Sequence, residues 1–432
     1  MSNRFQVCIF EDSQATQMTP YQVSRPCYTI PSGFYNLVDR MALVFPDAPV
    51  HLICQPHHAL LLKKRYPKVS VNDFNKSLPT LFINGRCNAE TPIIRELMSS
   101  INPQKNRLYI HDESVIALYC QDELSSIVFN ALTECPGFDD IIRIARHKSM
   151  VEDIKNVPMV AHWWDYISQL EHALTRDFES FPKKSLIEGD ISSFTTLIND
   201  QGMYIDQNSH VREYVSLDAT NGPIVIMGNV TIQPFVHIEG PCVIGQNSTV
   251  FSYAHISASA IGSYCKIGGE VTRSIVQSYS NKSHAGYLGD SMVGEWVNLG
   301  AQTTVSNLKL SYGTINSHSF NQVLMPTDHQ FLGAIFGDHV KTGIQSTFSC
   351  GSVVSSGSSL HGTGIHATFI PPFSWGSPNN YSRQDMPAFI ESVQRMMQRR
   401  GLALSDEEQL AFKELHHLTR PNDALVKTPL EN

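Results

Sequence analysis

The 432-residue sequence lacks several features that would place it in a simple class. It contains no run of 18 apolar residues, so it predicts no membrane-crossing helix. Its first residues, MSNRFQVCIFEDSQ, include acidic side chains and no apolar core of a signal peptide. It has no basic block, and a net charge of −8 argues against a nucleic-acid partner. We therefore expect a cytoplasmic protein that binds neither nucleic acid nor membrane.

Paired cysteines of the kind that hold metal ions are also missing. The nine cysteines are scattered, odd in number and never spaced as CxxC. Such usage is typical of reduced thiols in a cytoplasm and gives no support to a zinc site, so no metal site is predicted. The composition, 42% hydrophobic and 17% charged, is that of a globular chain long enough for two or three domains.

A six-residue repeat occupies the middle of the chain, from about residue 205 to residue 360. Its longest in-phase run is Ile226, Ile232, Ile238, Ile244, Val250 and Ile256. This period fits neither a helix nor an alternating strand, but it fits short strands joined by tight corners, each with one side chain pointing inward. Three such strands close a triangular coil of about 18 residues, so that Ile226 stacks on Ile244. The pattern resembles a left-handed parallel β-helix, and a β-sandwich with accidental spacing is the alternative.

The regions on either side of the repeat have a different character. Residues 1–200 are predicted to be a mixed α/β domain, because they contain strand-length apolar runs and segments of helical spacing. The strands are expected at 5–10, 48–54, 78–84 and 107–111, and the helices at 92–100, around 140–154 and at 165–178. Residues 201–376 are assigned to the β-helix domain and residues 377–432 to a C-terminal helical extension. In that extension one helix covers 385–400 and ends at Gly401, and Ser405 starts a second helix that packs on the β-helix.

The stretch SNKSHAGYLGD at 280–290, followed by VNLGA and an asparagine, carries the most specific resemblance. It is similar to the acetyltransferase half of the bifunctional N-acetylglucosamine-1-phosphate uridyltransferase / glucosamine-1-phosphate N-acetyltransferase family, over about residues 205–360. Wider features such as FED, SRP, WWDY and PPFSWG extend the likeness to a branch of sugar nucleotidyltransferases with a hexapeptide-repeat β-helix. The resemblance implies a homotrimer whose acyl-CoA site lies between neighbouring β-helices.

The same resemblance implies roles for individual residues. His284 matches the catalytic base, and Asn307 matches the asparagine that positions the attacking amine. Tyr287 and Asn298 match sugar-phosphate contacts, and Ala301 falls where backbone amides meet the thioester of acetyl-CoA. A histidine that removes the proton of the amine contributes about 10²–10⁴-fold to the rate. The alternative is that His284 is simply a polar residue at a strand corner.

The sequence also departs from this family. The family follows its asparagine with Tyr-Asp, where this chain has Leu308 and Lys309. The family's upstream basic residue is absent, so Arg273 and Lys282 are the nearest candidates to bind the substrate phosphate, and either could equally be a solvated surface charge. The stretch 306–331 breaks the repeat and is predicted to be an inserted loop that closes over the site or the neighbouring subunit.

The N-terminal domain lacks the usual nucleotide cradle. Sugar-1-phosphate nucleotidyltransferases carry a glycine-rich loop after their first strand, because glycine lets backbone N–H groups approach phosphates. Here that loop reads EDSQATQMTPYQVSRPCY, and the first glycine of the chain is Gly33. Asn84 stands where a metal-binding aspartate is expected, which leaves Asp112 as a substitute. Arg25 and Arg86 are weak candidates for nucleotide binding, and Mg²⁺ would be needed only if this domain is active.

These observations lead to one hypothesis and two alternatives. The hypothesis is an acyl-CoA-dependent N-acetyltransferase of nucleotide-sugar biosynthesis that acts on an amino-sugar 1-phosphate, with acetyl-CoA as cosubstrate and no metal. One alternative is a sugar-1-phosphate nucleotidyltransferase that uses UTP or dTTP and has a regulatory β-helix. The other is a non-catalytic protein that binds a nucleotide sugar or acts as a scaffold.

Overall fold

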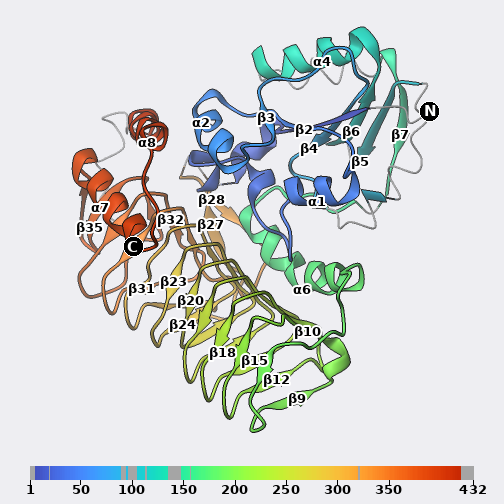
Figure 1. Ribbon diagram of the computed structural model, residues 1–432. Helices are drawn as coiled ribbons and strands as arrows, with labels where there is room; N and C mark the ends of the chain where they lie inside the picture. Colours follow the sequence, from blue (N-terminus) through green and yellow to red (C-terminus); the bar gives the residue numbers. More distant parts are fainter. Residues whose placement is uncertain are drawn as a thin grey trace.

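The computed structural model describes residues 5–18, 20–88, 94–95, 105–111, 114–134, 147–155, 157–319 and 322–419. An α/β domain lies along one side of a long β-helix, and two helices cover the far end of that β-helix (Figure 1). Among the helices in these ranges, none has both the length and the hydropathy needed to cross a bilayer.

The N-terminal domain is built on one seven-stranded sheet with the order β3-β2-β1-β4-β6-β5-β7. Its strands are β1 (Gln6–Phe10), β2 (Val50–Leu52), β3 (Ser70–Val71), β4 (Thr80–Asn84), β5 (Arg107–His111), β6 (Ser114–Cys120) and β7 (Met150–Asp153). Its helices are α1 (Leu37–Val44), α2 (Pro56–Arg65), α4 (Asp122–Glu134) and α6 (Trp163–Glu179). Strands β1 to β4 are mutually parallel, and β6 and β5 follow as antiparallel neighbours.

The predicted strands of this domain are confirmed, and so is the helix expected at 165–178. The helix expected around 140–154 is wrong at its C-terminal end. Residues Met150–Asp153 form an edge strand instead, because their backbone pairs in parallel with β5. Of the helix expected at 92–100, only residues 94–95 lie within the described ranges.

The β-helix has three walls of parallel strands, and each strand pairs with the strand one coil further along. Wall 1 consists of β10 (Met203–Ile205), β13 (Ile224–Ile226), β16 (Cys242–Ile244), β19 (Ala260–Ile261), β22 (Ile275–Val276), β25 (Met292–Val293), β29 (Ile335–Phe336), β32 (Val353–Val354) and β34 (Phe369–Ile370). Wall 2 consists of β8 (Asp190–Ile191), β11 (His210–Val211), β14 (Thr231–Ile232), β17 (Thr249–Val250), β20 (Lys266–Ile267) and β23 (Asn281–Lys282), and it continues through Asn298 to β30 (Lys341–Thr342) and β33 (Ser359–Leu360). Wall 3 consists of β9 (Thr196–Ile198), β12 (Ser216–Asp218), β15 (His237–Glu239), β18 (His255–Ser257), β21 (Glu270–Thr272) and β24 (Tyr287–Gly289), and it continues with β26 (Thr304–Val305) and β31 (Thr347–Phe348).

The stacking predicted from the six-residue repeat is confirmed. Ile226 pairs with Ile244 in wall 1, and the equivalent aliphatic residues pair in walls 2 and 3. These inward side chains form one continuous core along the axis of the left-handed β-helix. The first coil begins upstream of residue 201, since Ile187 already pairs with Ile205.

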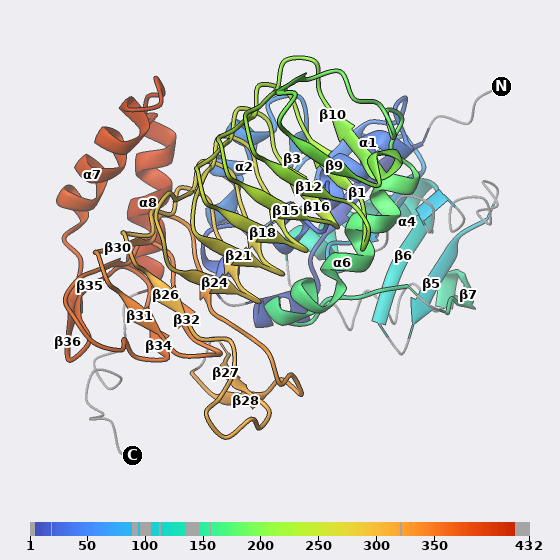
Figure 2. The same ribbon diagram turned by 90° about the horizontal axis from the view of Figure 1, so that it is seen from below.

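Wall 1 is buried on both faces. Its inward residues belong to the axial core, whereas outward residues such as Val225 and Val243 pack against the N-terminal domain. Trp163 and Ile167 of α6 belong to this second cluster, and so do residues of the segment that follows β1. Figures 1 and 2 both show α6 lying along the β-helix. The two domains therefore share one hydrophobic wall.

The C-terminal extension contains the two predicted helices, α7 (Met386–Gln398) and α8 (Asp406–Leu418). Gly401 adopts the left-handed conformation (φ +70°) just beyond α7, and Ser405 caps α8 through the amide of Glu408. Phe389 packs on Phe373 at the end of the β-helix, and Phe412 packs on Phe389. The closing hairpin of β35 (Ser374–Ser377) and β36 (Asn380–Arg383) follows Phe373 in the chain.

The predicted insertion after wall 3 is also present. Residues 306–319 and 322–331 leave the coil. Their strands β27 (Asn316–His318) and β28 (Leu324–Pro326) pair antiparallel and project from the β-helix in Figure 2. The chain then returns to wall 1 at β29.

Candidate active site

The Tyr-Leu-Gly-Asp motif forms strand β24 and the corner after it. Leu288 points into the axial core, and Tyr287 lies on the outer face of wall 3. A Cβ atom on Gly289 would lie 2.2 Å from Tyr287 Oη, so only glycine leaves room for this tyrosine ring. Asp290 adopts a left-handed conformation (φ 48°) and is buried at the corner. The motif therefore fixes one hydroxyl and one carboxylate side by side.

Asn307 joins this pair through a hydrogen-bond network. Its Nδ2 donates to Tyr287 Oη at 2.9 Å and to Asp290 Oδ2 at 2.6 Å. Arg273 Nε donates to the other carboxylate oxygen of Asp290 at 2.5 Å. Burial, and then the charge of Asp290, raises the pKa of Tyr287, so its hydroxyl stays protonated at neutral pH. Three residues predicted for the site, Tyr287, Asn307 and Arg273, thus meet around Asp290.

A cavity of about 300 Å³ adjoins this network. Helix α6 of the N-terminal domain, the β-helix and the returning end of the insertion all contribute to its lining, through Trp164, Ile167, Ser168, Glu171, Arg273, Asp290, Asp328, His329, Gln330, Phe331 and Leu332. The Arg273 guanidinium lies 6.0 Å from the centre of the Phe331 ring. Three carboxylates face one guanidinium in this lining, so the cavity favours a cationic group such as an ammonium.

His284 lies at the corner between walls 2 and 3, three residues before Tyr287, and its side chain is exposed. Within the described ranges its ring makes no hydrogen bond or ion pair with another side chain, whereas its backbone carbonyl accepts from Lys282 Nζ at 3.1 Å. Ala301 occupies the same corner one coil further on, where the amide of Gln302 donates to Ala285 O at 2.9 Å. The structure therefore places His284 and Ala301 on one edge of the prism.

Two other predicted substrate contacts lie elsewhere. Lys282 occupies an inward position opposite Ile267, is 3% exposed, and donates from Nζ to Gly268 O at 2.7 Å. Its ammonium is directed at backbone carbonyls inside the corner and is not available to a substrate phosphate. Asn298 is exposed on wall 2, where its Oδ1 accepts from Asn281 Nδ2 at 3.3 Å, so it lies on a different sheet from Tyr287.

Arg86, expected as a weak nucleotide contact, is already paired in the N-terminal domain. It donates from Nε and Nη2 to the two carboxylate oxygens of Asp12, both at 2.7 Å, and from Nη1 to Val160 O. Asn84 Nδ2 also donates to Asp12, at 2.8 Å. All three side chains are buried. Because the only carboxylate in this group is neutralised by an arginine, these residues do not fit a Mg²⁺ site; Asp112 lies outside the described residues.

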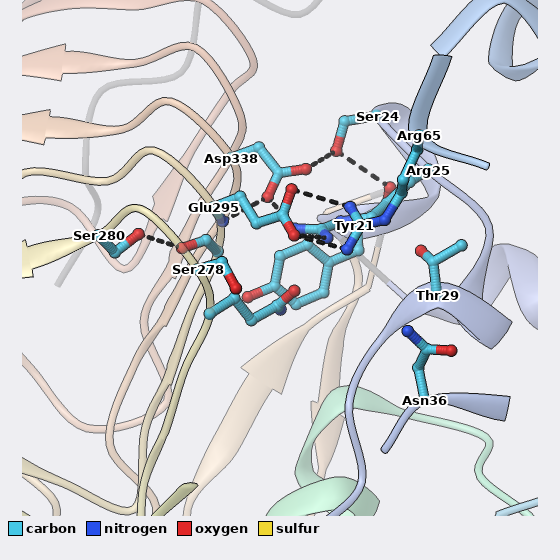
Figure 3. Close-up of polar contacts among 12 residues, drawn as sticks. Tyr21, Ser24, Arg25, Thr29, Asn36, Arg65, Ser278, Ser280, Glu295 and Asp338 are labelled. Atoms are coloured by element: carbon cyan, nitrogen blue, oxygen red, sulfur yellow. Dashed lines mark hydrogen bonds and ion pairs between the residues drawn. The ribbon is translucent and has the colours of Figure 1, made fainter. Parts of the chain in front are cut away.

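Arg25, the other weak nucleotide candidate, binds the β-helix instead (Figure 3). Its guanidinium pairs with Asp338 and, at 3.3 Å, with Glu295, while Ser24 Oγ donates to Asp338 at 2.6 Å. Arg65 adds a bidentate pair to Glu295 at 2.6 and 2.8 Å. Burial alone would raise the pKa of Glu295, but the charges of Arg65 and Arg25 outweigh it and lower that pKa to about 2. The segment that cradles phosphates in working nucleotidyltransferases is here part of a domain interface.

Some residues of the site were not singled out from the sequence. Asp290 is part of the recognised motif, but nothing in its spacing shows that it would join Arg273 to Asn307. Glu171 lies on a helix of another domain, so only the fold brings it to the cavity. The loss of the repeat over 306–331 was the one signal for Asp328 and Phe331.

The fold defines a class of protein in which an α/β domain precedes a hexapeptide-repeat β-helix. Residues 7–185 match the family described as "Sugar nucleotidyl transferase". The chain is also similar to proteins named bifunctional protein GlmU. It is 33% identical over 123 residues to that of Synechococcus elongatus, covering 28% of this chain and 20% of that protein. It is 29% identical over 201 residues to that of Methanococcus aeolicus, covering 44% and 48%.

A further relative is the bifunctional sugar-1-phosphate nucleotidylyltransferase/acetyltransferase of Sulfurisphaera tokodaii, 36% identical over 84 residues, or 19% of this chain and 21% of that protein. The alignments thus span between about a fifth and a half of the length of these relatives. Among solved structures, the UDP-N-acetylglucosamine acyltransferase of Arabidopsis covers 52% of this chain and 91% of its own, with 13% identity and a TM-score of 0.22. The predicted resemblance to the GlmU-like bifunctional transferases is confirmed.

Proposed function

We propose that this protein is an acyl-CoA-dependent acyltransferase of nucleotide-sugar biosynthesis, which transfers an acetyl group from acetyl-CoA to the amine of an amino-sugar 1-phosphate. The observation that carries this proposal is the network in which Asn307 joins Tyr287 and Asp290. Tyr287 begins the strand that follows His284, and Asp290 lines the cavity. The relatives named as acetyltransferases support the same reaction class.

In the proposed reaction the amine nitrogen attacks the thioester carbonyl of acetyl-CoA. The C–N bond forms, the C–S bond breaks, and His284 accepts the proton that the amine loses and passes it to the leaving thiolate. The backbone amide of Ala301 is suited to stabilise the oxyanion that develops on the carbonyl. The acidic cavity favours the ammonium form of the acceptor on binding. That ammonium releases one proton to solvent before the attack, and Asn307 then orients the neutral nitrogen towards the thioester.

We propose that the active form is a homotrimer. The N-terminal domain covers the outer face of wall 1, and the C-terminal extension contacts wall 2 at Asn281 and Lys341, which leaves the edge between walls 2 and 3 for a neighbouring chain. Four exposed aromatic residues follow one another along that edge with ring centroids 5.2–5.6 Å apart: Phe194, Tyr214, Phe235 and Tyr253. His284 and Ala301 continue the same edge, so an acyl-CoA bound there would lie between two β-helices. Sedimentation should then give three chains per particle, and Phe235→Asp should reduce that number.

Nucleotidyl transfer with UTP or dTTP is the second candidate, and the family of residues 7–185 favours it. The buried Asp12–Arg86 pair and the Arg25–Asp338 pair count against it, because both arginines already have carboxylate partners. A scaffold role without catalysis is the third candidate. Cytoplasmic location remains a prediction from the sequence.

Mass spectrometry of small-molecule products distinguishes the three candidate functions. The purified chain is incubated with acetyl-CoA and glucosamine 1-phosphate, and separately with Mg²⁺, a sugar 1-phosphate and UTP or dTTP. The proposal expects an acetylated sugar in the first reaction and a loss of about 10²–10⁴-fold with His284→Gln. His210→Gln is the matched control, since His210 is a partly exposed β-helix histidine on wall 2.

Pyrophosphate in the second reaction, with no product in the first, would instead support nucleotidyl transfer. Equal acetylation by the wild type and His284→Gln would remove His284 from the mechanism and leave acyl transfer standing. No product across a panel of amino-sugar phosphates and acyl-CoA donors would favour the scaffold.

A further inference from the structure

Two histidines and one glutamate converge on the outer face of wall 3, away from the cavity. His237 and His255 are paired in register on the neighbouring strands β15 and β18, and Glu239 lies two residues after His237 on the same face. One ligand atom from each of the three residues lies within 4.8 Å of the other two. None of the three residues belongs to the proposed acyl-transfer site.

Two separations among these atoms are close to those around a metal ion. Glu239 Oε1 lies 2.8 Å from His237 Nε2 and 3.4 Å from His255 Nε2. Bonds of about 2.0–2.2 Å at tetrahedral angles place neighbouring ligand atoms roughly 3.4 Å apart. Glu239 Oε1 already lies at that separation from His255 Nε2, and it would move away from His237 Nε2 by about 0.6 Å to receive an ion between them.

The donor set suits a divalent metal ion, and one of its nitrogen atoms makes no hydrogen bond with any residue that the structure describes. His255 Nε2 is buried and takes part in no hydrogen bond within the described part of the chain, although it points at a carboxylate. Two imidazole nitrogens and one carboxylate oxygen are a common ligand set for zinc and similar first-row divalent ions, with the remaining position open to water or substrate. The three side chains are 37–45% exposed, so an ion could enter from solvent and keep an open position.

Over the described ranges, the ion pair between His210 and Asp190 on the same β-helix lacks a third metal ligand. On wall 2, His210 Nδ1 lies 3.0 Å from Asp190 Oδ2, but the third group at that carboxylate is Arg212, at 3.6 Å, which repels a cation. On wall 3 the third group is a second imidazole. The paired strands hold all three ligands on one rigid surface, which reduces the entropy lost when an ion binds.

We propose that His237, Glu239 and His255 form a binding site for one divalent transition-metal ion of the zinc type per chain. The site is independent of the proposed acyl transfer and of the N-terminal domain. It takes its ligands from two adjacent coils, so a bound ion links those coils from outside.

The test is isothermal titration of the full-length, tag-free chain with Zn²⁺ after chelator treatment, with Co²⁺ absorption as a second readout. We expect one ion per chain, visible bands of four- or five-coordinate Co²⁺, and at least a tenfold weaker affinity in Glu239→Gln. The double variant His237→Ala/His255→Ala should lose the site, and His210→Ala should keep it. Circular dichroism of each variant confirms that it is folded.

Zinc also binds thiols, and the described residues contain eight free cysteines. Titration after thiol alkylation therefore accompanies each measurement. Unchanged stoichiometry and affinity in the double histidine variant would overturn the proposal, as would the absence of binding in the alkylated wild type. Binding that survives alkylation and disappears with the two histidines would support it.

Discussion

Replacement of Lys282 by methionine tests the free-energy cost of burying a charge inside the β-helix. Lys282 takes an inward position that other coils fill with an aliphatic residue, and burial lowers its pKa to about 8. An unfolded lysine has a pKa of about 10.4, so between pH 8 and 10 the unfolded chain holds a proton that the folded chain has released. Stability therefore rises with pH in this window by about 1.4 kcal/mol per pH unit from this residue alone, or about 3 kcal/mol in total.

Lys282→Met removes that contribution and nearly conserves volume. At pH 7 the variant avoids about 3 kcal/mol of charge burial and loses two hydrogen bonds, to Gly268 O and His284 O, worth about 1 kcal/mol each. We expect it to be more stable than the wild type by about 1 kcal/mol at pH 7, and less stable by about 2 kcal/mol at pH 10. The sign of the difference should reverse within the window.

The assay is urea unfolding of both proteins, followed by circular dichroism in reductant at half-unit steps from pH 7 to pH 10. Buried thiols such as Cys242 and Cys265, whose pKa burial raises to about 12, lower stability with rising pH, but they are common to both proteins and cancel in the difference. Lys341→Met is the matched variant, since burial lowers the pKa of Lys341 to about 8 as well. A difference between Lys282→Met and wild type that stays constant from pH 7 to pH 10 would refute the desolvation argument.

Three further predictions concern the domain interface and the C-terminal helices. Arg25→Met should lower the free energy of unfolding, measured in urea, by about 3–5 kcal/mol, because it leaves Asp338 buried without its cation. The double variant Arg25→Met/Asp338→Asn should recover part of that loss. Equal losses in the single and double variants would contradict this prediction. Glu295 has a pKa of about 2, so its contribution to stability is fully present above its unfolded pKa of about 4.3 and is lost as pH falls towards 2. Glu295→Gln should therefore make the free energy of unfolding depend less steeply on pH in this range, as followed by tryptophan fluorescence. A curve that keeps its slope would argue against this. Ser405→Ala should cost about 1 kcal/mol in thermal unfolding through loss of the cap on α8, and Ser405→Asp, which keeps an acceptor, should not; an equal loss in both would exclude the cap as the cause.

The β-helix could be predicted from the sequence because its interior imposes a simple rule. One side chain per strand must be apolar, and the spacing of Ile226, Ile232 and Ile238 reports the length of each wall directly. The same rule explains the clearest error at the site. Lys282 occupies an inward position of that repeat, so its predicted contact with a substrate phosphate is wrong.

The roles of the arginines could not be predicted, because ion pairs depend on distance in space. Arg25 and Asp338 are 313 positions apart in the chain, and only the packing of two domains brings them together. One sequence signal for that packing was present. Wall 1 strands such as Ile224–Ile226 are apolar at consecutive positions, which is typical of strands covered on both faces.

The doubly covered wall means that neither half of this protein is a natural unit for separate expression. A fragment starting near residue 187 would expose a continuous apolar strip to water, and such a strip favours aggregation. The strip consists of Tyr204, Val225, Val243 and Ile275. Substitutions on either side of the seam must also suit the partner surface, so the two halves have to change together even if only one of them carries out chemistry.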